Sequence, residues 1–182
     1  MTSQTESRLA SFRKRRDTQF KEAANSPLTE EQKANFNGLS YYPETPELGF
    51  AVELDTTGEG IDEVLTIGTV NGSAKEYIRA GRVHVLIDGT PTTLSVFKDT
   101  TRGHFFLPFR DATAGSETYS VGRYLEPRAL PDGRLSIDFN QAYNPYCAYN
   151  EGWSCPIPPM ENRIQVPIHA GEKLPDFSGS EE

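Results

Sequence analysis

The chain has 182 residues, of which 36% are hydrophobic and 24% are charged. This length fits one domain, and this balance excludes a disordered chain. The formal net charge of -8 argues against a general nucleic-acid binder, and no apolar run is long enough to suggest a membrane span. Because residues 1–25 also have no hydrophobic stretch of secretory type, we expect a cytoplasmic protein.

Two helices are expected at the start of the chain. Residues from about 6 to 24 follow a helical pattern. Further on, Thr29 is a predicted N-cap and Gln32 is its expected capping-box partner. Asn37-Gly38 then supplies a stop signal. The chain therefore opens with one long helix and one short helix.

The first helix is basic, whereas the rest of the chain is acidic. We interpret it as a helix whose cations face the acidic body of its own domain. The alternative is a basic surface for an anionic partner. The cations in this stretch are Arg8, Arg13, Lys14, Arg15, Arg16 and Lys21.

After residue 42 the pattern changes from helical to alternating, which predicts strands. Asn71-Gly72 and Asp88-Gly89 are hairpin signals, because these residue types tolerate the positive φ of a tight turn. Residues 140–159 are rich in Pro, Asn, Tyr and Gly, and we interpret them as a long ordered loop of the kind that often has a function. The predicted strands cover residues 48–54, 64–70, 77–79, 82–87, 94–97, 104–109, 135–139 and 166–168.

Short strands separated by turn signals are typical of an antiparallel β-sandwich or a partly open β-barrel. We therefore expect a mainly β fold of about nine short strands, preceded by two N-terminal helices. Residues 1–182 form one domain in this interpretation. Residues 1–38 pack as helices on the β body, and residues 174–182 form a frayed tail.

The familiar catalytic signatures are absent from the sequence. It contains no Gly-x-Ser-x-Gly elbow, phosphate-binding loop, glycine-rich dinucleotide fingerprint or His-Glu-x-x-His motif. This argues against the commonest hydrolases, nucleotide enzymes and zinc proteases. It leaves open whether the protein is an enzyme of another kind.

Polar residues mixed with aromatic ones in residues 106–124 and 138–150 indicate a candidate site. Strand alternation predicts that two arginines and two acids share one polar pocket, where a small anionic ligand is held by paired hydrogen bonds. The alternative is a buried ion-pair network that fixes the loops and has no ligand. The predicted ligand-binding residues are Arg79, Arg123, Tyr119, Asn140, Tyr143 and Asn144. The predicted catalytic residues are Asp111 and Asp138, which would orient donors or exchange protons, and Cys147 at the pocket edge.

The two cysteines, Cys147 and Cys155, are expected to be thiols. A catalytic thiol needs a base or cation nearby, and buried inert cysteine is the competing interpretation. A metal site with two of His84, His104 and His169 is conceivable, but the spacing matches no standard zinc motif. We predict no metal and no cofactor.

A second functional hypothesis is a protein–protein interaction module. Its surface would combine the basic N-terminal helix with the proline-rich loop at Pro156, Pro158 and Pro159. A third hypothesis is a stable β domain whose polar network is purely structural. We expect no nucleic-acid or membrane partner, and the oligomeric state stays open.

The motifs also resemble a family named domain of unknown function 1684, which is found in bacteria and archaea. The resemblance implies one structural unit over nearly the whole chain and implies no activity. One departure is visible, because a basic residue is expected just before Phe50, where this chain has Leu48-Gly49. The motifs that carry the resemblance are Arg16-Asp17, Phe36-x-Gly38-Leu39, Tyr77-x-Arg79-x-Gly81, Phe106-x-Pro108-Phe109-x-Asp111-x-Thr113-x-Gly115, Gly122-Arg123-Tyr124, Asp138-Phe139-Asn140, Ala142-Tyr143-Asn144-Pro145, Cys155-Pro156 and Ala170-Gly171-Glu172-Lys173.

Overall fold

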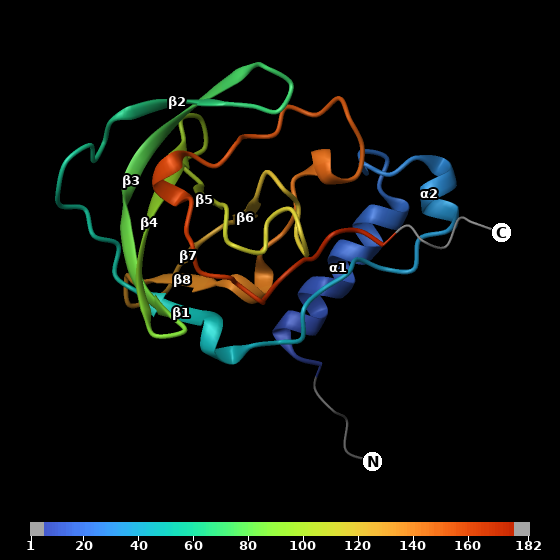
Figure 1. Cartoon of the computed structure of the whole chain (residues 1–182), viewed down its shortest axis with the longest axis horizontal. Helices are drawn as coiled ribbons and strands as arrows, with labels where there is room; N and C mark the ends of the chain where they lie inside the picture. The colour runs from blue at the N-terminus through green and yellow to red at the C-terminus, as the bar shows by residue number, and fades with distance from the viewer. Residues whose placement is uncertain (1–5, 177–182) are drawn as a thin grey trace, which may run out of the picture.

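The structure, a computed structural model, describes residues 6–176 and is mainly β, as the sequence predicts (Figure 1). One sheet has the strand order β2-β3-β4-β5-β6 and curls into an open half-barrel, and the second has the order β1-β8-β7. All pairs of neighbouring strands in the two sheets are antiparallel. The helices and strands are α1 (Arg8–Glu22), α2 (Glu30–Ala34), β1 (Gly49–Val52), β2 (Val64–Gly68), β3 (Ala74–Ile87), β4 (Thr90–Asp99), β5 (Phe105–Phe109), β6 (Arg123–Leu125), β7 (Arg128–Ala129) and β8 (Leu135–Asp138).

The two predicted hairpin turns are confirmed. Asn71-Gly72 joins β2 to β3, and Gly72 has a φ of +86°. Asp88-Gly89 joins β3 to β4, and both of its residues have positive φ. At Asp88-Gly89, two residues with positive φ match the right-handed twist of the strands that flank a two-residue turn. Local turn chemistry therefore sets the register of β3 and β4.

Two predicted strands, residues 77–79 and 82–87, form the single long strand β3. The register against β4 shifts between Arg79 and Gly81, so a bulge bends the strand without ending it. A Cβ at Gly81 would lie 2.7 Å from the carbonyl oxygen of Asp55, so this close approach requires glycine. The bulge and the twist it adds are consistent with the curl of the larger sheet.

Three further strand assignments differ from the sequence interpretation. The short strands β6 and β7 were not predicted, because two or three residues give no alternation to detect. Residues 166–168 were predicted as a strand and are not one. Instead the Ile168 amide donates to the buried carboxylate of Asp111, a side-chain partner that no periodicity reveals.

The main core fills the space between the two sheets. Val83, Val85 and Ile87 of β3 alternate with outward-facing residues, and Leu135 and Ile137 of β8 do the same from the opposite sheet. Such alternation buries one face of each sheet against the other. The rest of this core comes mainly from β4, β5 and β6 and includes Leu94, Val96, Leu107, Phe109 and Leu125.

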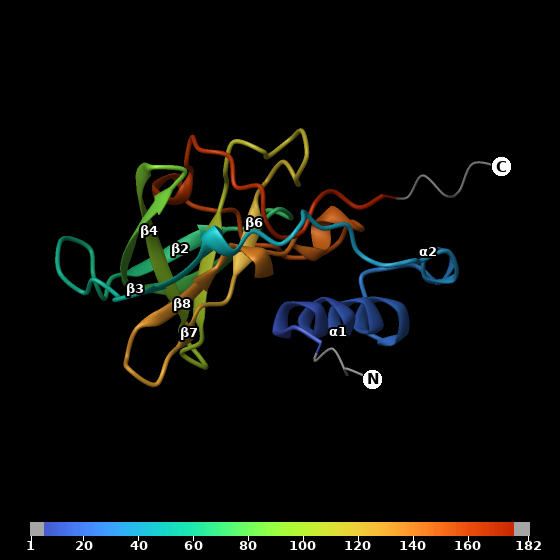
Figure 2. The same ribbon diagram turned by 90° about the horizontal axis from the view of Figure 1, so that it is seen from below.

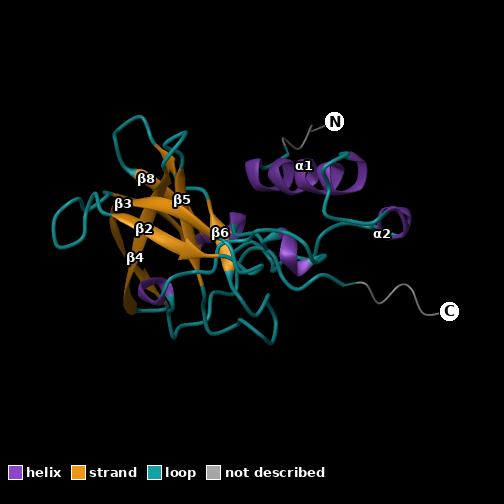
Figure 3. Ribbon diagram, turned by 90° about the horizontal axis from the view of Figure 1, so that it is seen from above, coloured by secondary structure: helices purple, strands orange, loops and turns teal. Residues whose placement is uncertain are grey.

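The two helices lie at one end of the molecule, beside the strands (Figures 2 and 3). Ser7 caps α1, and Thr29 and Gln32 form the predicted capping box of α2. Helix α2 ends at Ala34, earlier than the Asn37-Gly38 stop signal indicates. Phe20 of α1 is fully buried in a separate apolar cluster.

Neither helix of the described residues has the length and apolar character needed to cross a bilayer. The predicted frayed tail is partly fixed at its start, because the Leu174 amide donates to the Glu117 carbonyl at 3.0 Å. Residues 177–182 of that predicted tail lie outside the described residues.

Gly122 provides a test of this packing. It has a φ of +132°, and a Cβ there would lie 2.5 Å from the Phe109 carbonyl oxygen and 2.8 Å from Pro158. We expect Gly122→Ala to lower the melting temperature by roughly 10 °C or more, since both backbone strain and a clash are introduced. The matched control is Gly133→Ala, where φ is +87° and nothing lies within 4 Å of the new Cβ. Equal melting temperatures for the two variants would contradict the packing at Gly122.

Candidate functional site

Arg123 lies at the centre of a buried polar network. Its side chain is fully buried, and its Nη2 lies 3.4 Å from Oδ1 of the equally buried Asp111. The guanidinium also lies over the Phe109 ring, 5.2 Å from its centroid. Burial lowers the pKa of Arg123 from its ordinary value, and the negative charge of Asp111 opposes this shift. One arginine and one acid of the predicted site are therefore paired with each other inside the protein.

The remaining donors of Arg123 bind backbone oxygens of the C-terminal segment. Its Nη1 donates to the carbonyls of Ala170 at 2.5 Å and Glu172 at 3.2 Å, and its Nη2 donates to Ile168 at 2.9 Å. Among the side-chain nitrogens of Arg123, Nε alone has no hydrogen-bond partner within the described chain. The guanidinium is thus occupied by its own protein, which favours the interpretation of a structural network at this position.

Arg79 is occupied in the same way at a different place. It forms a paired hydrogen bond with Glu161, from Nε at 3.0 Å and from Nη2 at 2.6 Å. Its Nη1 donates to the Gly60 carbonyl at 2.7 Å. Within residues 6–176, no hydrogen bond or ion pair joins Arg79 to Arg123 or Asp111. Arg79 and Arg123 therefore share no hydrogen-bond partner in this structure.

The predicted amides and Asp138 also have internal partners. Asp138 accepts hydrogen bonds from the backbone and the side chain of Asn140, which in turn holds the backbone of Thr45. Asn144 is buried and donates to the Lys173 carbonyl at 2.8 Å. These contacts link loops, and Asp138 additionally faces a groove that is described below.

A second buried ion pair attaches α1 to the β body. Arg16 of α1 donates to the fully buried carboxylate of Glu172 at 2.9 Å. Asn144 also donates to Glu172, at 3.3 Å. Full burial raises the pKa of Glu172 to about 7, although Arg16 opposes the shift. This pair confirms that one cation of the basic helix faces its own domain.

A groove with a volume of about 1050 Å³ separates α1 from the β body. One wall is α1, with Arg8, Leu9, Phe12 and Arg15. The other wall comes from the ends of β5 and β6, from β7 and β8, and from the segment after β8. It includes Phe105, Leu125, Arg128, Ser136, Asp138 and Tyr143. Two residues of the predicted site, Asp138 and Tyr143, therefore lie in one groove.

The arginines of the groove are not occupied internally. Arg8, Arg15 and Arg128 are exposed, and no hydrogen bond or ion pair joins their side chains to another described residue. By contrast, two groove carboxylates have partners: Glu126 accepts from the Tyr143 hydroxyl at 3.0 Å, and Asp138 accepts from Asn140. Sequence reasoning marked the basic stretch of α1 but did not connect it with Arg128, which is far along the chain.

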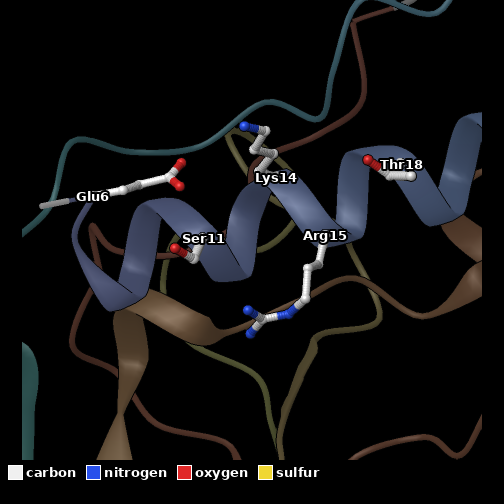
Figure 4. A pocket seen from close by; sticks show the side chains of 5 residues that line it. All are labelled: Glu6, Ser11, Lys14, Arg15 and Thr18. Carbon is white, nitrogen blue, oxygen red and sulfur yellow. The ribbon is translucent and has the colours of Figure 1, made fainter.

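A shallow depression of about 340 Å³ on α1 is a poorer candidate. It is lined by residues of α1 and by Glu6 just before it, and it shares Glu6, Ser11 and Arg15 with the groove. Figure 4 shows that Lys14 and Arg15 point away from each other, so these side chains do not converge on a ligand. The proline-rich loop adds little surface to this face, because Pro156 and Pro158 are buried in the domain.

A hydrogen-bonded array on the exposed face of β3 and β4 was also missed by sequence reasoning. His84 bonds Thr93 through Nδ1 at 2.9 Å and Asp55 through Nε2 at 3.0 Å. His84 and Thr93 are direct cross-strand partners, and neither lines the groove. We interpret the array as a cross-strand contact of the sheet surface.

Cys147 and Tyr119 lie apart from the groove. Burial, together with the neighbouring thiol of Cys155, raises the pKa of Cys147 to about 12. Burial raises the pKa of Tyr119, and both cysteines add to the shift. A thiol that holds its proton this firmly is a poor nucleophile at neutral pH. The catalytic role of Cys147 stays a prediction.

Substitution of Arg123 separates a structural role from a ligand-binding one. We expect Arg123→Met to destabilise the protein by about 3–5 kcal/mol, because Asp111 would be left as an uncompensated buried charge. Arg134→Met is the matched control: Arg134 is an exposed arginine paired with Asp132, and its loss should cost about 1 kcal/mol at most. Thermal melting measures both variants. Near-wild-type stability of Arg123→Met would instead support the ligand-binding interpretation.

The burial of Glu172 predicts a pH dependence of stability. Its pKa is about 7 in the folded chain against an ordinary 4.5, so between these values the folded state holds a proton that the unfolded state has lost. The free energy of unfolding should then fall as pH rises through this window, by about 1.4 kcal/mol per unit at most. Denaturant melts of wild type and Glu172→Gln from pH 4 to 8 check this. Other groups cancel in the difference, and parallel curves would refute the assignment.

Comparison with known proteins places the chain in a family. The model of the family described as "Protein of unknown function (DUF1684)" matches residues 34–173. The solution NMR structure of an uncharacterised protein from Haloarcula marismortui is 34% identical, with 91% of each chain covered and a TM-score of 0.67. No curated protein matches. The chain therefore belongs to the DUF1684 family.

Proposed function

We propose that the groove between α1 and the β body binds a small anionic molecule. This proposal rests on which arginines already have hydrogen-bond partners inside the protein. Arg79 and Arg123 use their donors on internal oxygens, whereas Arg8, Arg15 and Arg128 face the groove without a partner among the described residues. An exposed guanidinium with free donors is well suited to a carboxylate, sulfonate or phosphate.

The shape and lining of the groove support a ligand that also has an apolar part. A volume of about 1050 Å³ is just above the usual range for small-molecule sites, so a ligand would fill part of the groove. Apolar side chains from both walls, Phe12, Phe105 and Leu125, lie among the charged ones. Pockets of this kind bury the body of a ligand against apolar groups and orient it by a few polar groups.

The carboxylates of the groove define which ligands fit. Glu6 and Glu44 also line it, so a molecule with several negative charges would be repelled. A single anionic group on an aromatic or aliphatic body matches this mixture best. Asp138 and Tyr143 lie in the same groove. In this proposal they contact the body of the ligand.

The test uses 8-anilinonaphthalene-1-sulfonate, a fluorescent probe with one sulfonate and an apolar body. We expect saturable binding to the wild type at low salt. The dissociation constant should rise about tenfold or more in Arg8→Gln/Arg15→Gln. The matched control is Lys14→Gln/Lys21→Gln, which removes two charges from the same helix outside the groove.

Melting curves of all variants show whether the fold is intact, because the probe also binds unfolded chains. Binding that weakens equally in both double variants would indicate a general charge effect and would overturn the proposal. Absence of saturable binding to the folded wild type would overturn it as well.

A further inference from the structure

The loop between Tyr146 and Cys155 folds back on itself. The rings of Tyr146 and Trp153 meet edge to face with centroids 5.0 Å apart, so the two arms of the loop lie side by side. At the end of the second arm, the Cys155 carbonyl accepts a hydrogen bond from Val70 at 2.9 Å, in the turn between β2 and β3. In the first arm, the Tyr146 ring meets the Phe20 ring of α1 with centroids 5.9 Å apart, so both arms are fixed by contacts outside the loop.

The two thiols meet across this loop. Sγ of Cys147 donates to the Trp153 carbonyl at 3.2 Å. Trp153 is two residues before Cys155, so this hydrogen bond places Cys147 beside the arm that carries Cys155. The thiol of Cys155 also contributes to the raised pKa of Cys147, as expected for neighbouring thiols. A disulfide between them requires a Cα–Cα distance of about 4.4–6.8 Å, and the experiment below tests whether the two side chains reach it. Both cysteines are free thiols in the structure.

We propose that Cys147 and Cys155 are a redox-active pair, which oxidised glutathione or a similar small disulfide converts to an intramolecular disulfide. Cys147 is half-buried and Cys155 is buried, so Cys147 reacts first. The pair lies outside the groove and is independent of the ligand proposed there.

The reaction proceeds by two exchanges. The Cys147 thiolate attacks one sulfur of oxidised glutathione, whose S–S bond breaks, and one glutathione leaves and takes up a proton. The Cys155 thiolate then attacks the sulfur of Cys147 in the mixed disulfide, and the second glutathione leaves in the same way. In sum, two protein thiols are oxidised to one disulfide, and one glutathione disulfide is reduced to two thiols that take the two protons.

The surroundings of Cys147 make this exchange slow and dependent on pH. Thiolate is the reacting form, and the high pKa of Cys147 keeps its fraction small near pH 7. Below that pKa the thiolate fraction rises about tenfold per pH unit, and the initial rate should rise with it. A rate that increases with pH in this way distinguishes the pair from a thiol activated for catalysis.

The disulfide would join two regions of the fold. Tyr146 and Tyr149, around Cys147, pack against Phe20 of α1, while Cys155 is bonded to the turn between β2 and β3. Oxidation would therefore fix the base of the helical end to the larger sheet. Because the closed ring restricts the unfolded chain, the oxidised protein should melt at a higher temperature, by roughly 5 °C.

The experiment incubates the reduced full chain with oxidised glutathione at pH 7, 8 and 9, quenches with acid and measures intact mass and peptide maps. We expect a loss of about 2 Da, a peptide linked through Cys147 and Cys155, and reversal by dithiothreitol. Cys155→Ser should stop at a glutathione adduct on Cys147, since the resolving thiol is missing. Cys147→Ser should react much more slowly at the buried Cys155.

Two outcomes would overturn the proposal. One is a wild type that accumulates a stable glutathione adduct, which would mean that Cys155 cannot reach Cys147. The other is a folded wild type that stays reduced at all three pH values while the urea-unfolded chain forms the disulfide. The unfolded sample is the control for the chemistry itself, so either result is decisive even if one serine variant fails to fold.

Discussion

The rest of the structure depends on the hydrogen bonds of the buried Arg123 guanidinium. It binds three backbone carbonyls of residues 168–172 and the carboxylate of Asp111, which in turn accepts from the Ile168 amide. Residues 168–172 form no strand; an isolated bridge joins Glu172 to Tyr41, and the side chain of Arg123 supplies donors to the carbonyls of Ile168, Ala170 and Glu172. Buried carbonyls without a donor would cost free energy, so the donors of Arg123 fix the position of this segment.

This constraint extends to the helical end of the molecule. With residues 168–172 fixed, Glu172 is held inside the protein, where it receives Arg16 of α1. Burying an ion pair costs free energy by itself. The Arg16–Glu172 pair therefore contributes more to the position of α1 than to the stability of the fold. Phe20 supplies the apolar packing that holds α1 in place. One wall of the groove thus depends on a chain of contacts that begins at Arg123.

The same reasoning decides which arginines are available for a ligand. A guanidinium has five donors, and those of Arg79 and Arg123 are largely used on internal oxygens. The groove arginines have no such partners among the described residues. Residue type alone could not distinguish the two groups, because both are arginines among aromatic side chains. The distinction lies in what each side chain contacts after folding.

The sequence by itself determined the local structure: the mainly β class, the capping box of Thr29 and Gln32, and the turns at Asn71-Gly72 and Asp88-Gly89. It also indicated that Arg123 and Asp111 share a network and that Asp138 and Tyr143 belong to candidate site positions. These features depend on contacts within a few residues or on strand alternation. Tertiary structure alone decided that β3 continues through its bulge, that Glu161 occupies Arg79, and that Arg8 and Arg128 line one groove. These contacts join residues that are distant along the chain. Helix and strand propensities depend on nearby residues, so they do not predict which distant atoms meet when the two sheets and α1 pack together.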